Sequence, residues 1–188
     1  MSFNRLLEIL LSDDVYEKIK ENEQEIFMMI PELKKCKGFN QNNKWHIYDV
    51  YEHILHVVAG VEKNKYLRIA ALFHDIGKPL TYIEDELGIG HFYNHWNVSL
   101  EIFNKYKDNF KLSNEEIKII ESLIYYHDIN LDKITKEEFE LLINTIDIEN
   151  IELLFILKRA DLLAQSPEFH NLLTTINKQE KEIIKVKK

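Results

Sequence analysis

The sequence predicts an all-α protein built as a single helical bundle, on the strength of three observations. Apolar residues recur at spacings of three and four rather than two, the period of amphipathic helices. Only 5 glycines and 3 prolines interrupt the 188 residues. The hydrophobic fraction of 45% is ample for a continuous core. A domain usually has about 100–200 residues, so we expect one domain over 1–188, or one domain with a small extra helical lobe.

Within that domain we expect a core at about 40–165, with N-terminal helices in 1–39 and a C-terminal helix in 166–188 packed on it. The first core helix is predicted by an apolar stripe at Val50, Ile54, Val57 and Val61. The next is predicted by a stripe at Leu67, Ala70, Ala71 and His74. Gly77 and Pro79 are expected to close this second helix.

The polar stretch from Glu84 to Asn94 contains Gly88 and Gly90 and is expected to be a loop over the functional site. Helices resume at Ser113, which forms a predicted capping box with Glu116.

The apolar stripe after Ser113 runs for about four turns and ends on His127. Thr135 and Glu138 repeat the capping-box pattern, and Ser166 before Pro167 marks another helix start. Leu154 and Asp161 are two turns apart on one helical face, so a carboxylate is expected to point toward the core.

Composition excludes several classes of function. The formal charge of −8 repels phosphate backbones, so an extended nucleic-acid surface is not expected. A single cysteine, Cys36, rules out an internal disulfide and a cysteine-rich zinc module. We find neither a signal-peptide pattern nor the run of about 18 apolar residues that spans a bilayer. These features predict no membrane association and a reducing, cytoplasmic location; they predict nothing about oligomeric state.

Histidines and carboxylates occupy positions where a helical core would ordinarily carry leucine. His53 borders one stripe, while His74 and His127 end two others. A single histidine of this kind is most often a hydrogen-bonded core residue. Buried Asp75 and Asp161, however, would each need a cation or several donors, since burying an unpaired carboxylate is strongly unfavourable. A shared metal ion would satisfy both residue types.

The most distinctive string is His74-Asp75-Ile76-Gly77-Lys78-Pro79. Neighbouring residues on a helix point about 100° apart, so His74 and Asp75 can share a metal only where the turn is distorted. We expect Gly77 to permit that distortion.

The chain resembles the HD-domain metal-dependent phosphohydrolases, whose pattern is a histidine, then an HD pair, often two further histidines, and a final aspartate. Three segments carry the resemblance: YDVYEHILHVV (48–58), LRIAALFHDIGKP (67–79) and HFYNHWNVSLEI (91–102). They are most similar to the HD domain attached to bacterial tRNA nucleotidyltransferases, over roughly 40–165. The resemblance implies a single helical bundle of the HD type.

The resemblance also implies a set of site residues. The metal ligands would be His53, His74, Asp75 and Asp161 for a single ion, with His95 and His127 adding a second ion bridged by Asp75. The catalytic residues would be Asp75 and Lys78, of which the lysine contacts substrate phosphate in some members. The chain has neither the length nor the glycine-rich strand motif of a nucleotidyltransferase head. We therefore expect an HD module that stands alone, without CCA-adding activity.

Such a ligand set suits one or two divalent ions, with Mn, Fe, Co, Ni, Zn and Mg left open. The expected activity is hydrolysis of phosphate monoesters or cyclic phosphodiesters of nucleotides by a metal-activated hydroxide. The expected partner is a small phosphorylated substrate, in particular a nucleotide. Two alternatives stay open: a di-iron HD-fold oxygenase and a non-catalytic HD module.

Other polar and aromatic residues carry weaker expectations. His56 or His91 could be the general acid for the leaving group, although a surface or supporting role is the simpler interpretation. His46 and His170 are expected to be structural or superficial. Four aromatic residues could stack on a nucleobase but are more often core residues: Trp45, Trp96, Tyr82 and Phe92.

Overall fold

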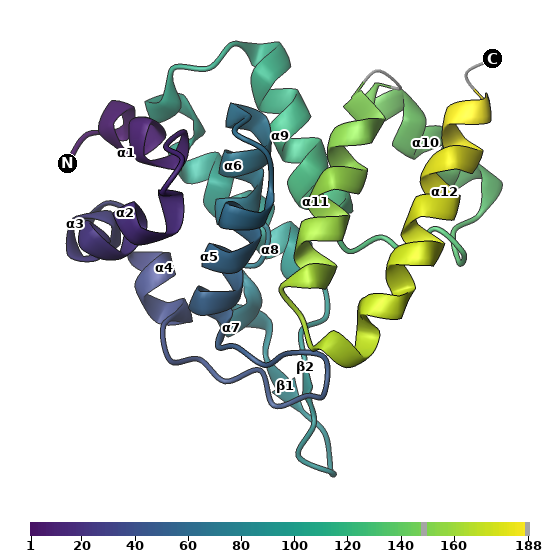
Figure 1. Cartoon of the computed structure of the whole chain (residues 1–188), viewed down its shortest axis with the longest axis horizontal. Coiled ribbons are helices and arrows are strands. Elements are labelled where there is room, and N and C mark those ends of the chain that lie inside the picture. The colour runs from purple at the N-terminus through teal and green to yellow at the C-terminus, as the bar shows by residue number, and fades with distance from the viewer. Residues whose placement is uncertain (148–149, 187–188) are drawn as a thin grey trace.

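The computed structural model describes residues 1–147 and 150–186, and this part of the chain is an all-α bundle, as predicted (Figure 1). The last two residues of the expected C-terminal helix, 187–188, lie outside the described residues. The N-terminal helices are α1 (Phe3–Leu10), α2 (Val15–Glu21), α3 (Glu23–Met29) and α4 (Pro31–Cys36). The central helices are α5 (Val50–Gly60), α6 (Lys65–Phe73), α7 (Lys78–Thr81), α8 (His95–Tyr106), α9 (Asn114–Tyr126) and α11 (Ile151–Leu163). On the C-terminal side lie α10 (Lys136–Ile146) and α12 (Leu173–Val186).

Helices α5 and α6 form the middle of the bundle, with α11 packed on α5 and α9 packed on α6. The N-terminal helices cover one side, where α1 contacts α6 while α2 and α4 contact α5. Helix α12 packs on α11 at the opposite side of the molecule (Figure 1). Residues from α5, from the end of α6, from α8 and from α11 therefore meet inside the bundle.

The core is aromatic as well as aliphatic. Phe73 at the end of α6 packs edge-on against Phe103 of α8, with ring centroids 5.3 Å apart, and both side chains are fully buried. Tyr51 of α5 packs against Phe27 of α3 in the same way at 5.2 Å. Full burial of such a side chain stabilises the folded state by roughly 1.5–3 kcal/mol. These contacts hold the ends of α5 and α6, which carry the candidate site, in fixed positions.

The predicted capping boxes are confirmed. Ser113 Oγ accepts a hydrogen bond from the Glu116 amide at 3.2 Å, and Glu116 Oε2 accepts one from the Ser113 amide at 2.8 Å. Thr135 and Glu138 make the same reciprocal pair at the start of α10. The start marked at Ser166 differs from the prediction: a 3₁₀ helix over Pro167–Leu172 comes first, and α12 begins at Leu173.

The predicted loop from Glu84 to Asn94 contains a short antiparallel hairpin. Strand β1 (Ile83–Glu84) pairs with β2 (Gly90–His91), Ile83 opposite His91. The intervening turn is stabilised by Asp85 Oδ1, which accepts hydrogen bonds from the amides of Leu87 and Ile89, both at 2.9 Å. Sequence periodicity cannot reveal strands of two residues, since they are too short to show alternation.

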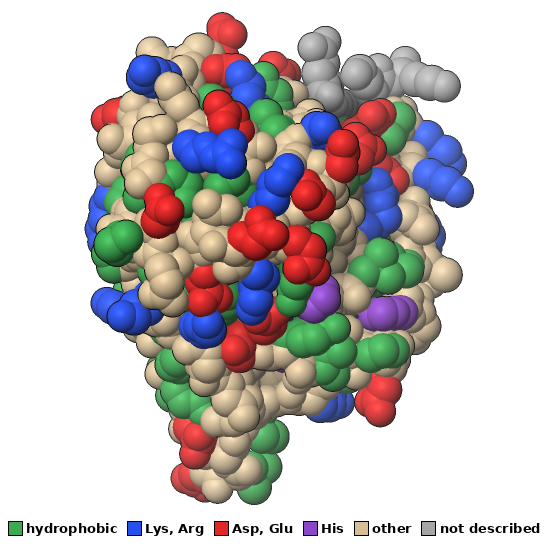
Figure 2. All heavy atoms as spheres, turned by 60° about the vertical axis from the view of Figure 1, so that its left-hand side comes forward, with side chains coloured by type: hydrophobic (Ala, Val, Ile, Leu, Met, Phe, Trp, Pro, Cys, Tyr) green, Lys and Arg blue, Asp and Glu red, His purple; other side chains and the backbone are tan. Residues whose placement is uncertain are grey.

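Surface charge and hydropathy agree with the composition. Acidic and basic side chains are interleaved over the face seen in Figure 2, without a continuous basic area. No helix in the described ranges has the length and apolar character needed to cross a bilayer.

Candidate metal centre

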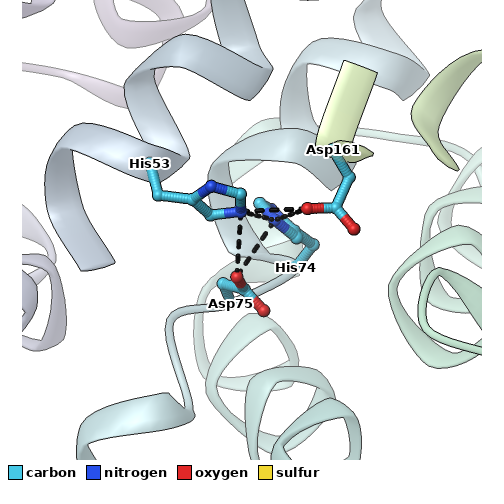
Figure 3. Close-up of side chains that lie close together, drawn as sticks. All are labelled: His53, His74, Asp75 and Asp161. Atoms are coloured by element: carbon cyan, nitrogen blue, oxygen red, sulfur yellow. Dashed lines mark hydrogen bonds and ion pairs between the residues drawn. The ribbon is translucent and has the colours of Figure 1, made fainter. Parts of the chain in front are cut away.

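Four of the six predicted ligands converge from three helices (Figure 3). His53 lies near the start of α5, His74 and Asp75 directly follow α6, and Asp161 lies on α11. His53 and His74 are fully buried, and Asp75 is 1% exposed. The convergence follows from the packing of α5 between α6 and α11.

The ligand atoms of this first group lie close together. His53 Nε2 is 3.0 Å from Asp161 Oδ1 and 3.2 Å from Asp75 Oδ2. His74 Nε2 is 3.4 Å from Asp75 Oδ2 and 3.9 Å from Asp161 Oδ1. One ligand atom from each of the four residues lies within 4.8 Å of all the others, a spacing that can hold one metal ion.

The other two predicted ligands form a second group around the same aspartate. His95 Nε2 is 3.2 Å from Asp75 Oδ1, and His127 Nε2 is 3.5 Å from that oxygen. The two histidine Nε2 atoms are 3.2 Å apart. Asp75 thus offers Oδ2 to the first group and Oδ1 to the second, so all six predicted residues are brought together.

Backbone carbonyl oxygens fix the tautomers of these histidines. His74 Nδ1 donates to the Ala71 carbonyl at 2.7 Å. In the same way, His95 Nδ1 donates to the Phe92 carbonyl at 2.8 Å, and His127 Nδ1 donates to the Ile124 carbonyl at 2.7 Å. His53 Nδ1 lies 3.3 Å from the Ala164 carbonyl. Because a carbonyl can only accept, the proton of each neutral ring is on Nδ1 and the Nε2 lone pair faces inward. Metal-binding histidines are commonly oriented by such outer contacts.

These features fit a bound cation. Asp75 Oδ1 and Oδ2 are buried and neither receives a hydrogen bond of good geometry within the described part of the chain. Inward-facing lone pairs of His95 and His127 oppose each other, which is unfavourable unless a positive charge lies between them. The mixture of imidazole nitrogen and carboxylate oxygen is a donor set for Mn, Fe, Co, Ni or Zn, and Mg needs more oxygen.

The pKa shifts also show that the site attracts positive charge. Burial opposes protonation of His53, but Asp161 and Asp75 outweigh it and raise the pKa of His53 to about 9. Burial likewise opposes ionisation of Asp75, yet Lys78 and His74 hold the pKa of that carboxyl well below its usual range. The pKa of Asp161 is lowered in spite of burial, chiefly by His53.

Gly77 has a different role from the one predicted. Its φ of −79° and ψ of −16° are ordinary helical values that any residue adopts, so it does not distort the turn. A Cβ at this position would instead lie 2.7 Å from the carbonyl oxygen of His95 and 2.7 Å from the amide nitrogen of Ser99. Gly77 is therefore needed for close approach of α8, which carries His95.

Lys78 lies at the site, where its ammonium group is enclosed by partners. Its Nζ is 2.6 Å from Asp75 Oδ2, donates to Gln41 Oε1 at 2.9 Å and lies 3.2 Å from His46 Nε2. The side chain is 7% exposed. The hydrogen-bond partners of the ammonium group are Gln41 and His46, and Asp75 is its ion-pair partner.

Sequence analysis missed three residues that surround this centre. His46, expected to be structural or superficial, contacts Lys78; burial and the charge of Lys78 lower its pKa to about 2. Gln41 is 1% exposed and holds Lys78 from the other side. Lys158 of α11 donates to the carbonyls of His127 and Ile129, both at 2.8 Å. The only sequence sign was the placement of Lys158 one turn before Asp161.

The centre opens into a cavity of about 590 Å³. Its walls include Asp75, Lys78 and Asp161, the hairpin residues His91 and Phe92, and part of α12. Of the Glu84–Asn94 segment, which was expected to lie over the site, residues 90–93 line the cavity, whereas residues 84–89 do not.

The remaining predicted residues separate into those at the cavity and those away from it. His91 lines the cavity, with Nε2 2.9 Å from Asp85 Oδ2. His56 instead stacks on Tyr48 at 4.2 Å, and His170 lies beside the Gln165 carbonyl. The four aromatic residues differ as well: Trp45, Trp96 and Phe92 line the cavity, whereas Tyr82 bonds to Glu84 on the hairpin.

The central region of the chain is similar in sequence to known proteins. Residues 45–166 match the HD domain family. An A-adding tRNA nucleotidyltransferase of Deinococcus radiodurans is 31% identical over 110 residues, which cover 55% of this chain and 25% of that protein. A CC-adding tRNA nucleotidyltransferase of Thermus thermophilus is 31% identical over 114 residues, which cover 57% of this chain and 25% of that protein.

The matched region is thus a quarter of the length of these relatives. The family match, by contrast, spans well over half of the 188 residues and contains all six residues of the candidate centre. The chain therefore belongs to the HD domain family.

Proposed function

We propose that the protein is a metal-dependent phosphohydrolase that cleaves phosphate monoesters or cyclic phosphodiesters of nucleotides. The observation that carries the proposal is the position of Asp75, whose two oxygens each face a separate pair of histidines. HD-domain proteins belong to a superfamily consisting mostly of such hydrolases, which supports the reaction class. The nucleotide is our inference, drawn from the relatives named above.

In this proposal His53, His74, Asp75 and Asp161 hold one cation, and Asp75, His95 and His127 hold a second. Bound divalent cations of this kind supply a hydroxide at neutral pH and neutralise the charge that develops on phosphate oxygens. The protein contributes the orientation of four imidazoles, since their Nδ1 atoms are fixed by backbone carbonyls. It also limits the entry of water, because the ligands are buried.

Lys78 binds phosphate in this proposal. Its contact with Asp75 compensates the buried carboxylate in the cation-free protein. When Asp75 also ligates cations, that compensation is no longer required from Lys78 alone. Because Lys78 lines the cavity, its ammonium group would be available to a non-bridging phosphate oxygen, where negative charge accumulates during transfer.

Of the two candidates for the general acid, His91 is the better placed. It lines the cavity, and its contact with Asp85 keeps one ring nitrogen oriented. His56 packs between Tyr48 and Tyr16 instead. We therefore propose His91 as the proton donor to the leaving group.

The test is release of p-nitrophenol from p-nitrophenyl phosphate and bis-p-nitrophenyl phosphate, of phosphate from nucleoside monophosphates, and of the ring-opened monophosphate from cyclic nucleotides, each with Mn, Co, Ni, Zn or Mg. We expect turnover with at least one ion, and a loss of at least about 100-fold in Asp75→Asn. Asp13→Asn is the matched control, because the Asp13 side chain is 91% exposed. Absence of turnover in every combination would contradict the proposal.

A di-iron oxygenase is the second candidate, because the same six residues could hold two iron ions. Iron-loaded protein would then consume oxygen and release no phosphate from the substrates above. A non-catalytic HD module would bind metal and show neither activity.

A further inference from the structure

A second cavity of about 380 Å³ lies beside the candidate metal centre. It is formed by the start of α8, the end of α9 and the segment that leads into α10. Its volume falls within the range of about 300–1,000 Å³ typical of small-molecule sites. None of the six candidate ligands lines it.

The two cavities adjoin each other. Four residues line both of them: Trp96, Asp128, Ile129 and Asn130. Trp96 directly follows His95, and the two rings have centroids 5.4 Å apart at an interplanar angle of 75°. Asp128 directly follows His127. The second cavity therefore shares a wall with the cavity of the metal centre, at residues adjacent to two of the candidate ligands.

The lining of this second cavity suits a flat ring. The aromatic side chains are Trp96, Tyr125 and Tyr126, and the aliphatic ones are Ile129, Ile134 and Leu141. No lysine, arginine or histidine is among the lining residues in the described part of the chain, so the cavity has no group suited to phosphate. Aromatic side chains bind nucleobases by stacking on their faces.

The charged groups of the cavity are two carboxylates. They belong to Asp128 and to Glu138, whose Oε2 also accepts a hydrogen bond from the Thr135 amide in the capping box. Asn130 uses Oδ1 to accept from the Asp132 amide at 3.1 Å, which leaves its amide donor group for another partner. A carboxylate accepts from N–H groups and repels carbonyl oxygens. Guanine presents two adjacent N–H donor groups on one edge, whereas uracil places its single N–H between two carbonyl oxygens.

We propose that this second cavity binds the nucleobase of the substrate, with guanine preferred and uracil bound most weakly. The inference rests on the proposed function, since it assigns the base to one cavity and the phosphate to the other. Free nucleotides and the terminal nucleotide of an RNA share this chemistry.

The first experiment compares hydrolysis of guanosine, adenosine, cytidine and uridine monophosphates with that of ribose 5-phosphate, which has no base. We expect kcat/KM to be highest for guanosine monophosphate. Trp96→Leu should lower this value roughly tenfold or more, as expected for loss of base stacking, with a much smaller effect on ribose 5-phosphate. Trp96→Phe should restore most of the preference, because an aromatic face is retained.

Leu141→Ala is a second variant with little risk to folding, because Leu141 is 59% exposed. Leu163→Ala, at 52% exposed and outside both cavities, is its matched control. We expect KM for guanosine monophosphate to rise in Leu141→Ala and to stay unchanged in Leu163→Ala. Equal kinetics for all five substrates, unchanged by Trp96→Leu, would overturn the inference and leave the hydrolase proposal intact.

The second experiment is independent of hydrolysis. The sequence has two tryptophans, so Trp45→Phe leaves Trp96 as the only tryptophan fluorophore. Guanosine, which has no phosphate, should quench its fluorescence saturably and more strongly than uridine. Quenching without turnover of any phosphate ester would support the cavity assignment and contradict the hydrolase proposal. No saturable quenching by guanosine would overturn the cavity assignment.

A third comparison distinguishes a free nucleotide from the terminal nucleotide of an RNA as the source of the base. Guanosine 5′-monophosphate and a short single-stranded RNA with a 5′-terminal guanosine 5′-phosphate are supplied at equal concentration. Higher kcat/KM for the mononucleotide assigns the cavity to free nucleotides, and higher kcat/KM for the RNA assigns it to a terminal nucleotide. Equal inertness of both, with turnover of ribose 5-phosphate, would contradict base binding from either source.

Discussion

The Nε2 atoms of His95 and His127 lie 3.2 Å apart, and each ring donates from Nδ1 to the carbonyl oxygen three residues earlier in the chain. His74 makes the same contact to Ala71. Backbone geometry thus aims several imidazole lone pairs at Asp75. Such an arrangement is unfavourable without a cation and well suited to holding one.

The number of bound ions should depend on the second histidine pair, His95 and His127. His95→Gln should reduce the stoichiometry from two ions per chain to one, because the group of His53, His74, Asp75 and Asp161 is left intact. Metal analysis after equilibrium dialysis measures the change. His170→Gln is the matched control, because His170 belongs to neither group of ligands and lies beside the Gln165 carbonyl. An unchanged stoichiometry in His95→Gln would show that His95 is not a ligand.

Gly77 should be intolerant of even a methyl group. Gly77→Ala places a Cβ 2.7 Å from backbone atoms of α8, so we expect destabilisation of about 1–3 kcal/mol. Gly60→Ala is the matched control, since its Cβ would meet Ala160 Cβ at 3.4 Å, and the change should stay within about 1 kcal/mol. Urea unfolding of both variants gives the comparison. Equal stability of Gly77→Ala and the parent would refute the close-approach argument.

Gln41 should affect turnover through Lys78. Gln41→Met keeps the volume of the side chain but removes the acceptor at 2.9 Å from Lys78 Nζ. We expect kcat to fall about tenfold with metal affinity nearly unchanged, because Gln41 is not a ligand. Gln24→Met, on the exposed face of α3, is the control. A parallel loss of metal affinity would mean that Gln41 supports the whole centre rather than the lysine.

Glu32 links α4 to α8 and makes stability depend on pH. Burial raises the pKa of Glu32, but hydrogen bonds from Tyr106 (2.7 Å) and Lys105 (3.2 Å) outweigh it and lower this pKa. A lowered folded-state pKa gives stabilisation that is present above the unfolded pKa and lost as the pH falls. Tyr106→Phe should therefore reduce the free energy of unfolding by about 1 kcal/mol at pH 7.

The difference in the free energy of unfolding between the parent and Tyr106→Phe should become smaller as the pH falls, because Glu32 becomes protonated in the parent as well. Urea unfolding of both proteins at pH 7, 5 and 3 measures this difference. A deficit that is constant across this range would show that lost packing, rather than the charged hydrogen bond, causes the effect.

Features set by local sequence were predicted well. Apolar stripes predict α5 and α6, and the capping boxes predict the starts of α9 and α10 to the residue. Four candidate ligands could be chosen because they lie on or beside apolar stripes: His53, His74, His127 and Asp161. Asp75 directly follows His74, and His95 was chosen through the family resemblance alone. The meeting of these six residues in space depends on how the helices pack, and this packing was implied only by the family resemblance.

Features set by contacts between distant segments were not predicted. The role of Gly77 depends on Ser99, whose Oγ accepts from the Gly77 amide at 3.0 Å across 22 positions. His46 reaches the site because the segment before α5 is fixed to the C-terminal part of the chain, where the Ser166 amide donates to the Trp45 carbonyl at 2.8 Å. No periodicity marks either contact, since both depend on the final packing of the bundle.

The most direct test of the metal centre is anomalous X-ray scattering from crystals grown with Mn²⁺ or Co²⁺. We expect one anomalous peak between His53, His74, Asp75 and Asp161 and a second between Asp75, His95 and His127, with ligand distances of about 2.0–2.2 Å. Peaks only at other positions, or none at these histidines in crystals saturated with either ion, would contradict the account.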